Sequence, residues 1–536
     1  MAIPLAVSRI PSTREKSSLL DLPDELLLVM LENMASNDLY SMASLCKRLH
    51  RLALPAYFAC HGIFEPMNIP LRHLTLRGDQ LNALPGLQLS LFVTSIRRLS
   101  CNFSHIESGE HLLNVIRGLH QLILKVNGSE DVTLDFQNCD HLLMAFQQCS
   151  RSMSDWVEAC EGLLTAVADC CLFLTVNHGK LYEEASQFHL IAKEMARHTH
   201  VPVISRPFVA LKKSLSFREG TSSRSWQAYV DPIPATSTHV RPSRLARPTL
   251  RRFRIQSPML LLPPHCDWTF RILNASSITQ LYLLHVPLST MTWSRVLPCI
   301  TISTLTHLSI GHCNIAFNDL ARFLSRHPKI YKLALSGYYT PPYLPHLPKA
   351  ILPRLASLHA SPENLTHFLK PVGALPKLDS LSIRLVIYRG RQFNIAEVEQ
   401  SISHVANRVR ECALALEVII ESLSADWLSS PHQDELAAGE RLLQQVTNVE
   451  FSVERGAASL LPTWLSLFPV LEHISFMNHS EGTWSRKDKV ALLRQIAEKC
   501  TTIQHVTIEG EKRDIAVWLA MDDVKVTGES VRLASN

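Results

Sequence analysis

Apolar residues recur along much of the chain in a short motif, apolar-x-x-apolar-x-apolar. Side chains of an extended strand alternate between its two faces, so the last two apolar residues of the motif share one face. Each copy therefore predicts a short strand with one buried face. Clear copies lie at residues 71–76, 278–283, 305–310, 330–335, 355–358, 378–383, 471–476 and 503–508, and weaker ones lie near Leu99, Leu122, Leu414 and Val449.

Neighbouring copies are often spaced by 23 to 27 residues, and a helical segment precedes many of the predicted strands. One such unit cannot bury its apolar face alone, whereas stacked neighbours can. The spacing, and the segment LTHLSIGHCNI with Cys313 at the Asn/Cys position, resemble leucine-rich repeats. The resemblance implies an α/β fold in which a curved solenoid carries a parallel sheet. An unrelated α/β domain whose strands alternate with helices is the alternative.

A different pattern near the N-terminus predicts three helices within residues 19–62. Pro23 suits the first turn of a helix, which should run to about Met34. Ser36 or Asn37 can cap a second helix that begins at Asp38.

The third helix is expected to be kinked or ended by Pro55. Its solvent-facing side should carry Lys47, Arg48, His50 and Arg51.

The first of these helices is more apolar than a surface helix needs to be. Residues 26–31 are six apolar residues in succession and cover most of its circumference. A module of about 40 residues cannot bury all of this surface internally. Excess apolar surface implies either a partner protein or packing against the rest of this chain, and the residues alone leave both open.

This stretch resembles the F-box motif, in particular its form in mushroom-type (basidiomycete) fungi. The usual aromatic near the end of the motif is replaced by Leu49. The family implies a three-helix module that binds a Skp-type adaptor and, through it, a cullin-based SCF ubiquitin ligase. The matching positions are Leu22, Pro23, Glu25, Leu26, Leu27, Met30, Met34, Asp38, Leu39, Leu45, Cys46 and Lys47.

Carried over to this chain, the resemblance implies a set of adaptor-binding residues. Packing among the three helices is the alternative role for each of them. The set consists of Leu22, Pro23, Leu26, Met30, Leu39, Leu45, Cys46 and Leu49.

The predicted strands also define a candidate target-binding surface. Side chains flanking the middle apolar residue point away from the core, and like positions of stacked strands form columns on the concave face. Ordinary solvated sheet is the alternative for each residue. The candidates are His73, His307, Ser309, Lys332, His359, Ser382, His473 and His505.

We expect six segments along the chain. They are a disordered tail at 1–18, the F-box at 19–62, first repeat-like strands at 63–136, a helical insert at 137–204, a basic flexible linker at 205–250 and a leucine-rich-repeat-like domain at 251–536. Eleven Lys or Arg and two acidic residues lie between Arg206 and Arg254. This segment is either a solvated insert or a contact for nucleic acid or an acidic partner.

Composition narrows the function classes. A hydrophobic share of 46% excludes wholesale disorder, and no apolar stretch is long enough to span a bilayer. The 13 cysteines lack regular spacing, which predicts free thiols in the cytoplasm or nucleus. Nucleophile-elbow, phosphate-loop and Cys-x-x-Cys motifs are missing from the sequence. We therefore expect neither catalysis nor a cofactor or metal.

The combined expectation is a non-catalytic substrate-recognition subunit of an SCF-type ubiquitin ligase, with the adaptor and cullin core and an unidentified protein target as partners. One alternative is an F-box scaffold that acts without ubiquitination. The other is a nucleic-acid-associated protein that uses the basic linker.

Overall fold

The computed structural model describes residues 19–64, 71–126, 129–147, 150–179, 249–337, 351–369, 375–387, 413–420, 446–452, 462, 465–466, 468–477, 486–508 and 511–519. These residues form a mixed α/β protein with a large parallel sheet, as the predicted fold class requires. The chain divides into two compact units, Met1–Cys171 and Leu172–Asn536. The expected tail at 1–18 and almost all of the expected linker at 205–250 lie outside the described residues.

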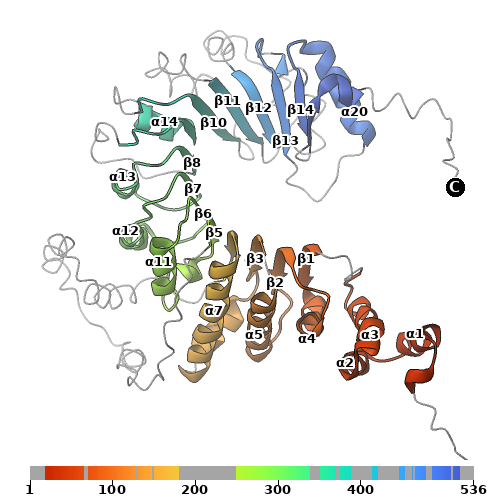
Figure 1. The fold of residues 1–536 in the computed structure, drawn as a ribbon. Coiled ribbons are helices and arrows are strands. Elements are labelled where there is room, and N and C mark those ends of the chain that lie inside the picture. Colours follow the sequence, from red (N-terminus) through yellow and green to blue (C-terminus); the bar gives the residue numbers. More distant parts are fainter. Residues whose placement is uncertain are drawn as a thin grey trace, which may run out of the picture. The chain divides into compact units, whose positions relative to one another are not determined.

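The first unit begins with a 3-10 turn, η1 (Leu19–Asp21), and three helices, α1 (Asp24–Glu32), α2 (Ser36–Leu45) and α3 (Lys47–Cys60). Strands β1 (Leu71–Arg77), β2 (Ile96–Asn102) and β3 (Asp131–Asp135) follow and pair in parallel. Between and after them lie η2 (Gly78–Ala83), α4 (Leu84–Leu89), α5 (Gly109–Lys125), α6 (Asp140–Gln147) and α7 (Ser150–Cys170). Helices α4, α5 and α7 lie on the same side of these strands (Figure 1).

The second unit contains strands that are neighbours in space in the order in which they occur in the chain. They are β4 (Phe173–Asn177), β5 (Arg252–Gln256), β6 (Gln280–Leu284), β7 (His307–Gly311), β8 (Lys332–Ser336), β9 (Ser357–Ala360), β10 (Ser380–Ile387), β11 (Ala413–Ile420), β12 (Val446–Ser452), β13 (His473–Met477), β14 (His505–Ile508) and β15 (Glu511–Asp514). Strands β4 to β14 pair in parallel, and β15 is antiparallel to β14.

Helical segments connect several of these strands. They are η3 (Pro258–Leu260), α11 (Cys266–Ala275), α12 (Thr290–Cys299), α13 (Phe317–Ser325), α14 (Pro362–Leu369) and α20 (Arg486–Lys499). Helices α11, α12 and α13 lie on one side of β6, β7 and β8 (Figure 1).

The predicted apolar motif builds the core of the second unit. Its middle leucines pair in register across five strands and are fully or almost fully buried. Burial of one such side chain contributes roughly 1.5–3 kcal/mol, so a row of them stabilises the stacking of successive units. The row consists of Leu281, Leu308, Leu333, Leu358 and Leu381.

Side-chain hydrogen bonds also connect successive strands and successive helices of the second unit. The Cys313 thiol is buried and donates to the Leu283 carbonyl oxygen of the neighbouring strand at 3.4 Å. Burial raises the pKa of this thiol to about 11, so it stays a protonated donor. At the helix ends, Asn274 Nδ2 donates to the Cys299 carbonyl at 2.9 Å. These side chains thereby supply hydrogen-bond donors to backbone carbonyl groups of the neighbouring strand and helix.

All eight clear copies of the motif contribute strands, but the weaker copy near Leu122 does not. Leu122 lies in helix α5 rather than in a strand, because its neighbours are buried at the three- and four-residue spacing of a helix. The segment expected as a helical insert at 137–204 contains α6 and α7, but also strand β4, with alternating burial. Residues 180–204 of that segment lie outside the described ranges.

The helix boundaries near the N-terminus also differ from those expected. Helix α1 ends at Glu32, and Ala35 rather than Ser36 or Asn37 precedes the first turn of α2. Pro55 does not end α3, which continues to Cys60. The carbonyl that loses its helical partner at Pro55 belongs to the exposed Arg51, where water can reach it.

Candidate functional site

The N-terminal helices divide their apolar residues between a core and an exposed surface. Leu27 and Leu31 of α1 are buried against the other two helices together with Leu39 and Leu49. The remaining apolar side chains of α1 are exposed, although contact of apolar groups with water is unfavourable. Their exposed fractions are 53% for Leu26, 40% for Leu28, 58% for Val29 and 47% for Met30, and Leu45 at the end of α2 is 68% exposed.

The predicted adaptor-binding residues fall into three groups. Pro23, Leu26, Met30 and Leu45 are exposed, and Leu22 and Cys46 are half-buried. Leu39 of α2 and Leu49 of α3 are buried, and these two helices pack against each other. They therefore do not lie on the exposed surface in this structure.

Leu28 and Val29 belong to the exposed surface but were not among the predicted residues. The signal that marks them is the unbroken apolar run at 26–31, which cannot be buried on one side of a helix. We call Leu26, Leu28, Val29, Met30 and Leu45 the apolar surface.

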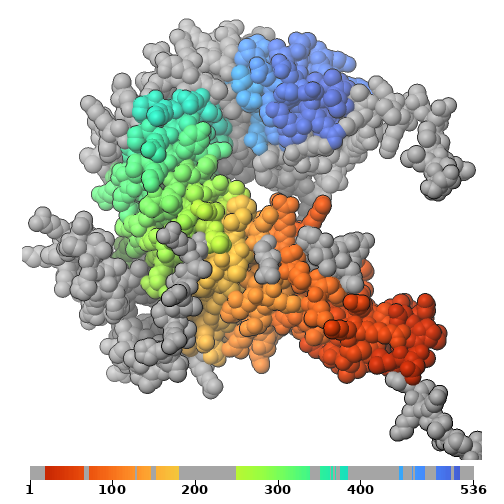
Figure 2. Space-filling view, viewed as in Figure 1, coloured from red at the N-terminus to blue at the C-terminus, as the bar shows by residue number. Residues whose placement is uncertain are grey.

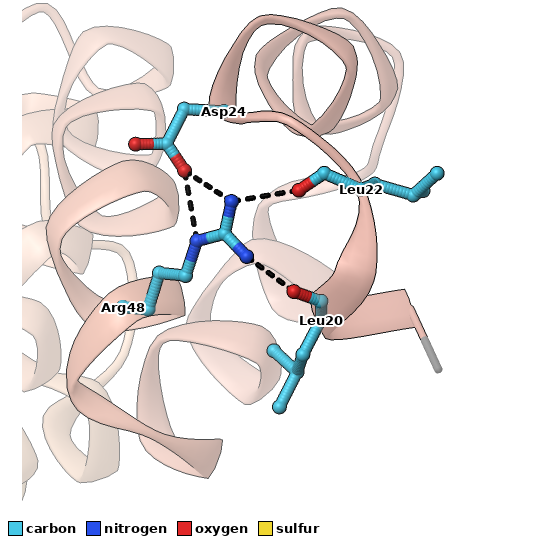
Figure 3. Close-up of polar contacts among 4 residues, drawn as sticks. All are labelled: Leu20, Leu22, Asp24 and Arg48. Atoms are coloured by element: carbon cyan, nitrogen blue, oxygen red, sulfur yellow. Dashed lines mark hydrogen bonds and ion pairs between the residues drawn. The ribbon is translucent and has the colours of Figure 1, made fainter. Parts of the chain in front are cut away.

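Arg48 fixes the start of α1, as Figure 3 shows. Its Nε and Nη2 donate to Asp24 Oδ1 at 2.8 and 2.6 Å, and Nη2 also donates to the Leu22 carbonyl at 2.7 Å. Nη1 donates to the Leu20 carbonyl. A guanidinium can bridge these acceptors because its donors form a rigid planar fork. Arg48 thus joins α3 to the segment that leads into the apolar surface.

His50 was expected on the solvent-facing side of α3 and is instead buried. Its Nδ1 donates to the Ala43 carbonyl at 3.0 Å, and its Nε2 accepts from the Leu91 amide at 3.1 Å. The neutral imidazole satisfies both backbone groups, which explains why a polar ring is retained in the core. Lys47 and Arg51 are exposed, as expected.

Helix α3 attaches the three helices to the rest of the first unit. The Tyr57 hydroxyl donates to the Asn82 carbonyl at 2.8 Å, and burial, followed by the neighbouring Tyr40, raises the pKa of Tyr57 to about 12. The Phe58 and Phe92 rings meet edge to face at 6.5 Å. In Figures 1 and 2 the three helices form one end of the unit. This attachment uses α3 and leaves the apolar surface of α1 exposed.

The face of the sheet opposite the helices carries the second candidate site. In the second unit, one column of face positions runs through Arg252, Gln280, His307, Lys332, Ser357 and Ser380. The adjacent column runs through Arg254, Tyr282, Ser309, Ala334, His359 and Ser382.

The structure brings most of the predicted face residues together in pairs. His307 lies beside Lys332, and His359 Nδ1 lies 2.8 Å from Ser382 Oγ. His473 lies beside His505, whose Nδ1 is 2.7 Å from Asp514 Oδ1.

The two remaining predicted face residues, Ser309 and His73, have other neighbours. Ser309 lies beside Tyr282. His73 belongs to the first unit, where Arg98 is its neighbour. None of these predicted residues is buried.

Three residues of this face were not predicted from the sequence. Arg252, Arg254 and Tyr282 lie on β5 and β6, and β5 was not predicted because its arginines continue the basic composition of the preceding segment. The available signal was the alternation of arginine with Phe253 and Ile255, both of which are buried.

Like charges gather around His307. Burial, followed by the positive charges of Lys332 and Arg252, lowers the pKa of His307. Burial, followed by Lys512 and His505, likewise lowers the pKa of His473. Both imidazoles are therefore biased toward the neutral form.

Across the described residues, no group of three His, Cys, Asp or Glu side chains could hold a metal ion. No helix in the same ranges has the length and apolar character needed to cross a bilayer.

No model of a known protein family matches this sequence, and a search of curated proteins returned no matching protein.

Proposed function

We propose that this chain is a non-catalytic substrate receptor of an SCF-type ubiquitin ligase. In this proposal α1, α2 and α3 form an F-box that binds a Skp-type adaptor. The strands and helices that follow form a leucine-rich-repeat-like solenoid whose sheet face binds a protein target. Ubiquitin transfer would be performed by other subunits, and this chain would contribute proximity and orientation.

The observation that carries the proposal is the apolar surface. The core of the three helices is already filled by Leu27, Leu31, Leu39 and Leu49, and α3 makes the attachment to the first unit. Leu26, Val29 and Met30 are left exposed on one short helix. Exposed apolar clusters of this kind mark protein-binding sites, and the F-box resemblance of the same residues identifies a Skp-type adaptor as the partner.

The regular pairing of the strands supports the second half of the proposal. Successive strands are parallel neighbours, their leucines align, and Cys313, at the position that resembles the Asn/Cys of a leucine-rich repeat, donates to the neighbouring strand. Stacked repeats of this kind present an extended face to a partner.

Co-expression with a Skp-type adaptor tests the proposal. We expect a stoichiometric complex on gel filtration that is abolished by Leu26→Asp combined with Met30→Asp. Arg51→Asp is the matched control, since Arg51 is an exposed residue of the same module outside the apolar surface. A complex that survives the double substitution would refute the proposed interface.

An F-box scaffold that acts without ubiquitination would form the same adaptor complex. Target turnover separates the two functions. Proteins that co-purify with the chain should have longer half-lives after deletion of residues 19–62 if the chain is a substrate receptor, and unchanged half-lives if it is a scaffold.

A further inference from the structure

Positive charge is concentrated on one part of the sheet face. Arg252 and Arg254 lie on β5, His307 lies on β7 and Lys332 lies on β8. The register places Gln280 between Arg252 and His307, and Tyr282 beside Arg254. We call Arg252, Arg254 and Lys332, together with the largely neutral His307 beside them, the basic face.

Both guanidinium groups are held in place by neighbouring rings and an amide. Arg252 lies 4.3 Å from the centre of the Phe173 ring, and its Nε donates to Gln280 Oε1 at 2.7 Å. Arg254 lies 5.1 Å from the centre of the Tyr282 ring. Ordering these side chains in advance lowers the entropy lost when they bind an anion.

Among the residues that the structure describes, no carboxylate balances the charges of the basic face. Within the described residues, none of Arg252, Arg254 and Lys332 forms an ion pair with Asp or Glu. The face positions of β4 to β9 also contain no acidic residue. Partial burial first, and then the positive charges of Lys332 and Arg252, lower the pKa of His307.

Basic residues on other parts of the chain do have acidic neighbours. His505 pairs with Asp514 on β15, and the strand register of the first unit places Asp131 beside Arg98. On β5 to β8, where the face positions supply no acidic neighbour, a bound anion would relieve the like-charge repulsion.

We propose that the basic face binds an extended acidic segment, containing several Asp or Glu residues, of the protein target. The inference rests on the proposed function, because the segment is assigned to the target of the ligase. Four adjacent strands span roughly 14 Å at about 4.8 Å per step, which matches four to five residues of an extended chain.

A polypeptide fits this surface better than a nucleic acid does. Single-stranded nucleic acids bind by stacking bases on free aromatic rings, but Arg254 and Arg252 already lie close to the Tyr282 ring. The rest of the face consists of small neutral positions such as Ser309, Ala334 and Ser357, which leave room for the backbone and side chains of a peptide.

Binding of a labelled peptide to the full-length chain tests the inference. The probe is a fluorescein-labelled peptide with five consecutive glutamates, and its glutamine counterpart is the control. We expect fluorescence anisotropy to detect the glutamate peptide alone, with affinity falling as salt rises. Arg252→Gln combined with Arg254→Gln should weaken binding about tenfold or more, which corresponds to about 1.4 kcal/mol.

Two further variants keep this test independent of folding. Lys332→Gln changes an exposed side chain and should also weaken binding. Arg271→Gln on α11, which pairs with Asp267 at 3.4 Å, should leave binding unchanged. Equal binding of the glutamine peptide, unchanged affinity in the Arg252 and Arg254 variant, or tighter binding of an oligothymidine of equal charge would overturn the inference.

Measuring adaptor binding with the same proteins shows whether this inference or the proposed function has failed. Loss of peptide binding by the arginine substitutions with an intact adaptor complex supports the inference. An intact adaptor complex without peptide binding in the unsubstituted chain overturns the inference alone. Peptide binding without an adaptor complex overturns the proposed ligase role but leaves an acidic-peptide receptor.

Discussion

At the scale of single residues, Arg48 shows how a distant contact shapes the candidate interface. It holds Asp24 and the carbonyls of Leu20 and Leu22 together at the entry to α1. The sequence could not predict this, because periodicity reports which side of a helix is polar but not which acceptors a long side chain reaches. The same limit explains His50, whose acceptor and donor lie 7 and 41 residues away.

Replacing Arg48 by Lys tests this contact without a change of charge. We expect faster amide hydrogen exchange in α1, corresponding to a local loss of about 1 kcal/mol, because an ammonium cannot bridge the three acceptors. The exposed neighbour substitution Arg51→Lys is the control. Exchange in α1 that is the same in both variants would contradict this role.

Gly86 provides a second residue-scale prediction. A Cβ at this position would lie 2.4 Å from Tyr57 Cε1 and 3.1 Å from Phe58 Cε1. Gly86→Ala should therefore loosen the attachment of α3 and lower the free energy of unfolding by about 1–3 kcal/mol.

Gly118→Ala is the matched control, read out by urea denaturation. The nearest atom to a Cβ at Gly118 is the amide nitrogen of the flexible Gln88 side chain, at 3.3 Å. Alanine there should be neutral or stabilising within helix α5. If both alanine variants had the same stability, close packing at Gly86 would be excluded.

At the scale of elements, the sequence predicted the three N-terminal helices and many of the strands, but it missed β3, β4, β5 and β15. The apolar motif identified its eight clear strands because one strand face is buried in every repeat. Strand β5 was not predicted because arginines occupy its other face. Leu122 was assigned to a strand because a short apolar run fits a helix or a strand equally well. Of the candidate site, the sequence predicted the columns but not the concentration of arginine on β5.

The end of helix α13 gives a pH prediction for one element. His327 is buried, its Nδ1 donates to the Phe323 carbonyl at 2.7 Å, and its Nε2 accepts from the Ile302 amide at 3.1 Å. Burial, the largest cause, lowers the pKa of His327 below 6.5. The unfolded chain therefore binds a proton at higher pH than the folded chain does.

Stability from His327 should be complete above the pKa of the unfolded chain and should decline as the pH falls below about 6.5. We expect His327→Gln to reduce the loss in unfolding free energy between pH 7.5 and 5.5. His111→Gln, on the exposed side of α5, is the matched control. If the unfolding free energy of the His327 variant depended on pH as it does in the unsubstituted chain, His327 would not be the cause of that dependence.

At the scale of the whole molecule, the described part of the chain carries two exposed surfaces of different chemistry. The apolar surface lies on the short helix α1, and the basic face lies on the sheet of the second unit. Apolar contact and charge complementarity recognise partners of different chemistry. This division is the physical basis of the proposed receptor role.

The adaptor complex is the most direct test of this account. The full-length chain, co-expressed with a Skp-type adaptor, should elute from gel filtration as a one-to-one complex. Leu26→Asp with Met30→Asp should abolish that complex while circular dichroism shows an unchanged fold, and Arg51→Asp should preserve it. Absence of a complex with the unsubstituted chain, or a complex that withstands the double substitution, would contradict the account.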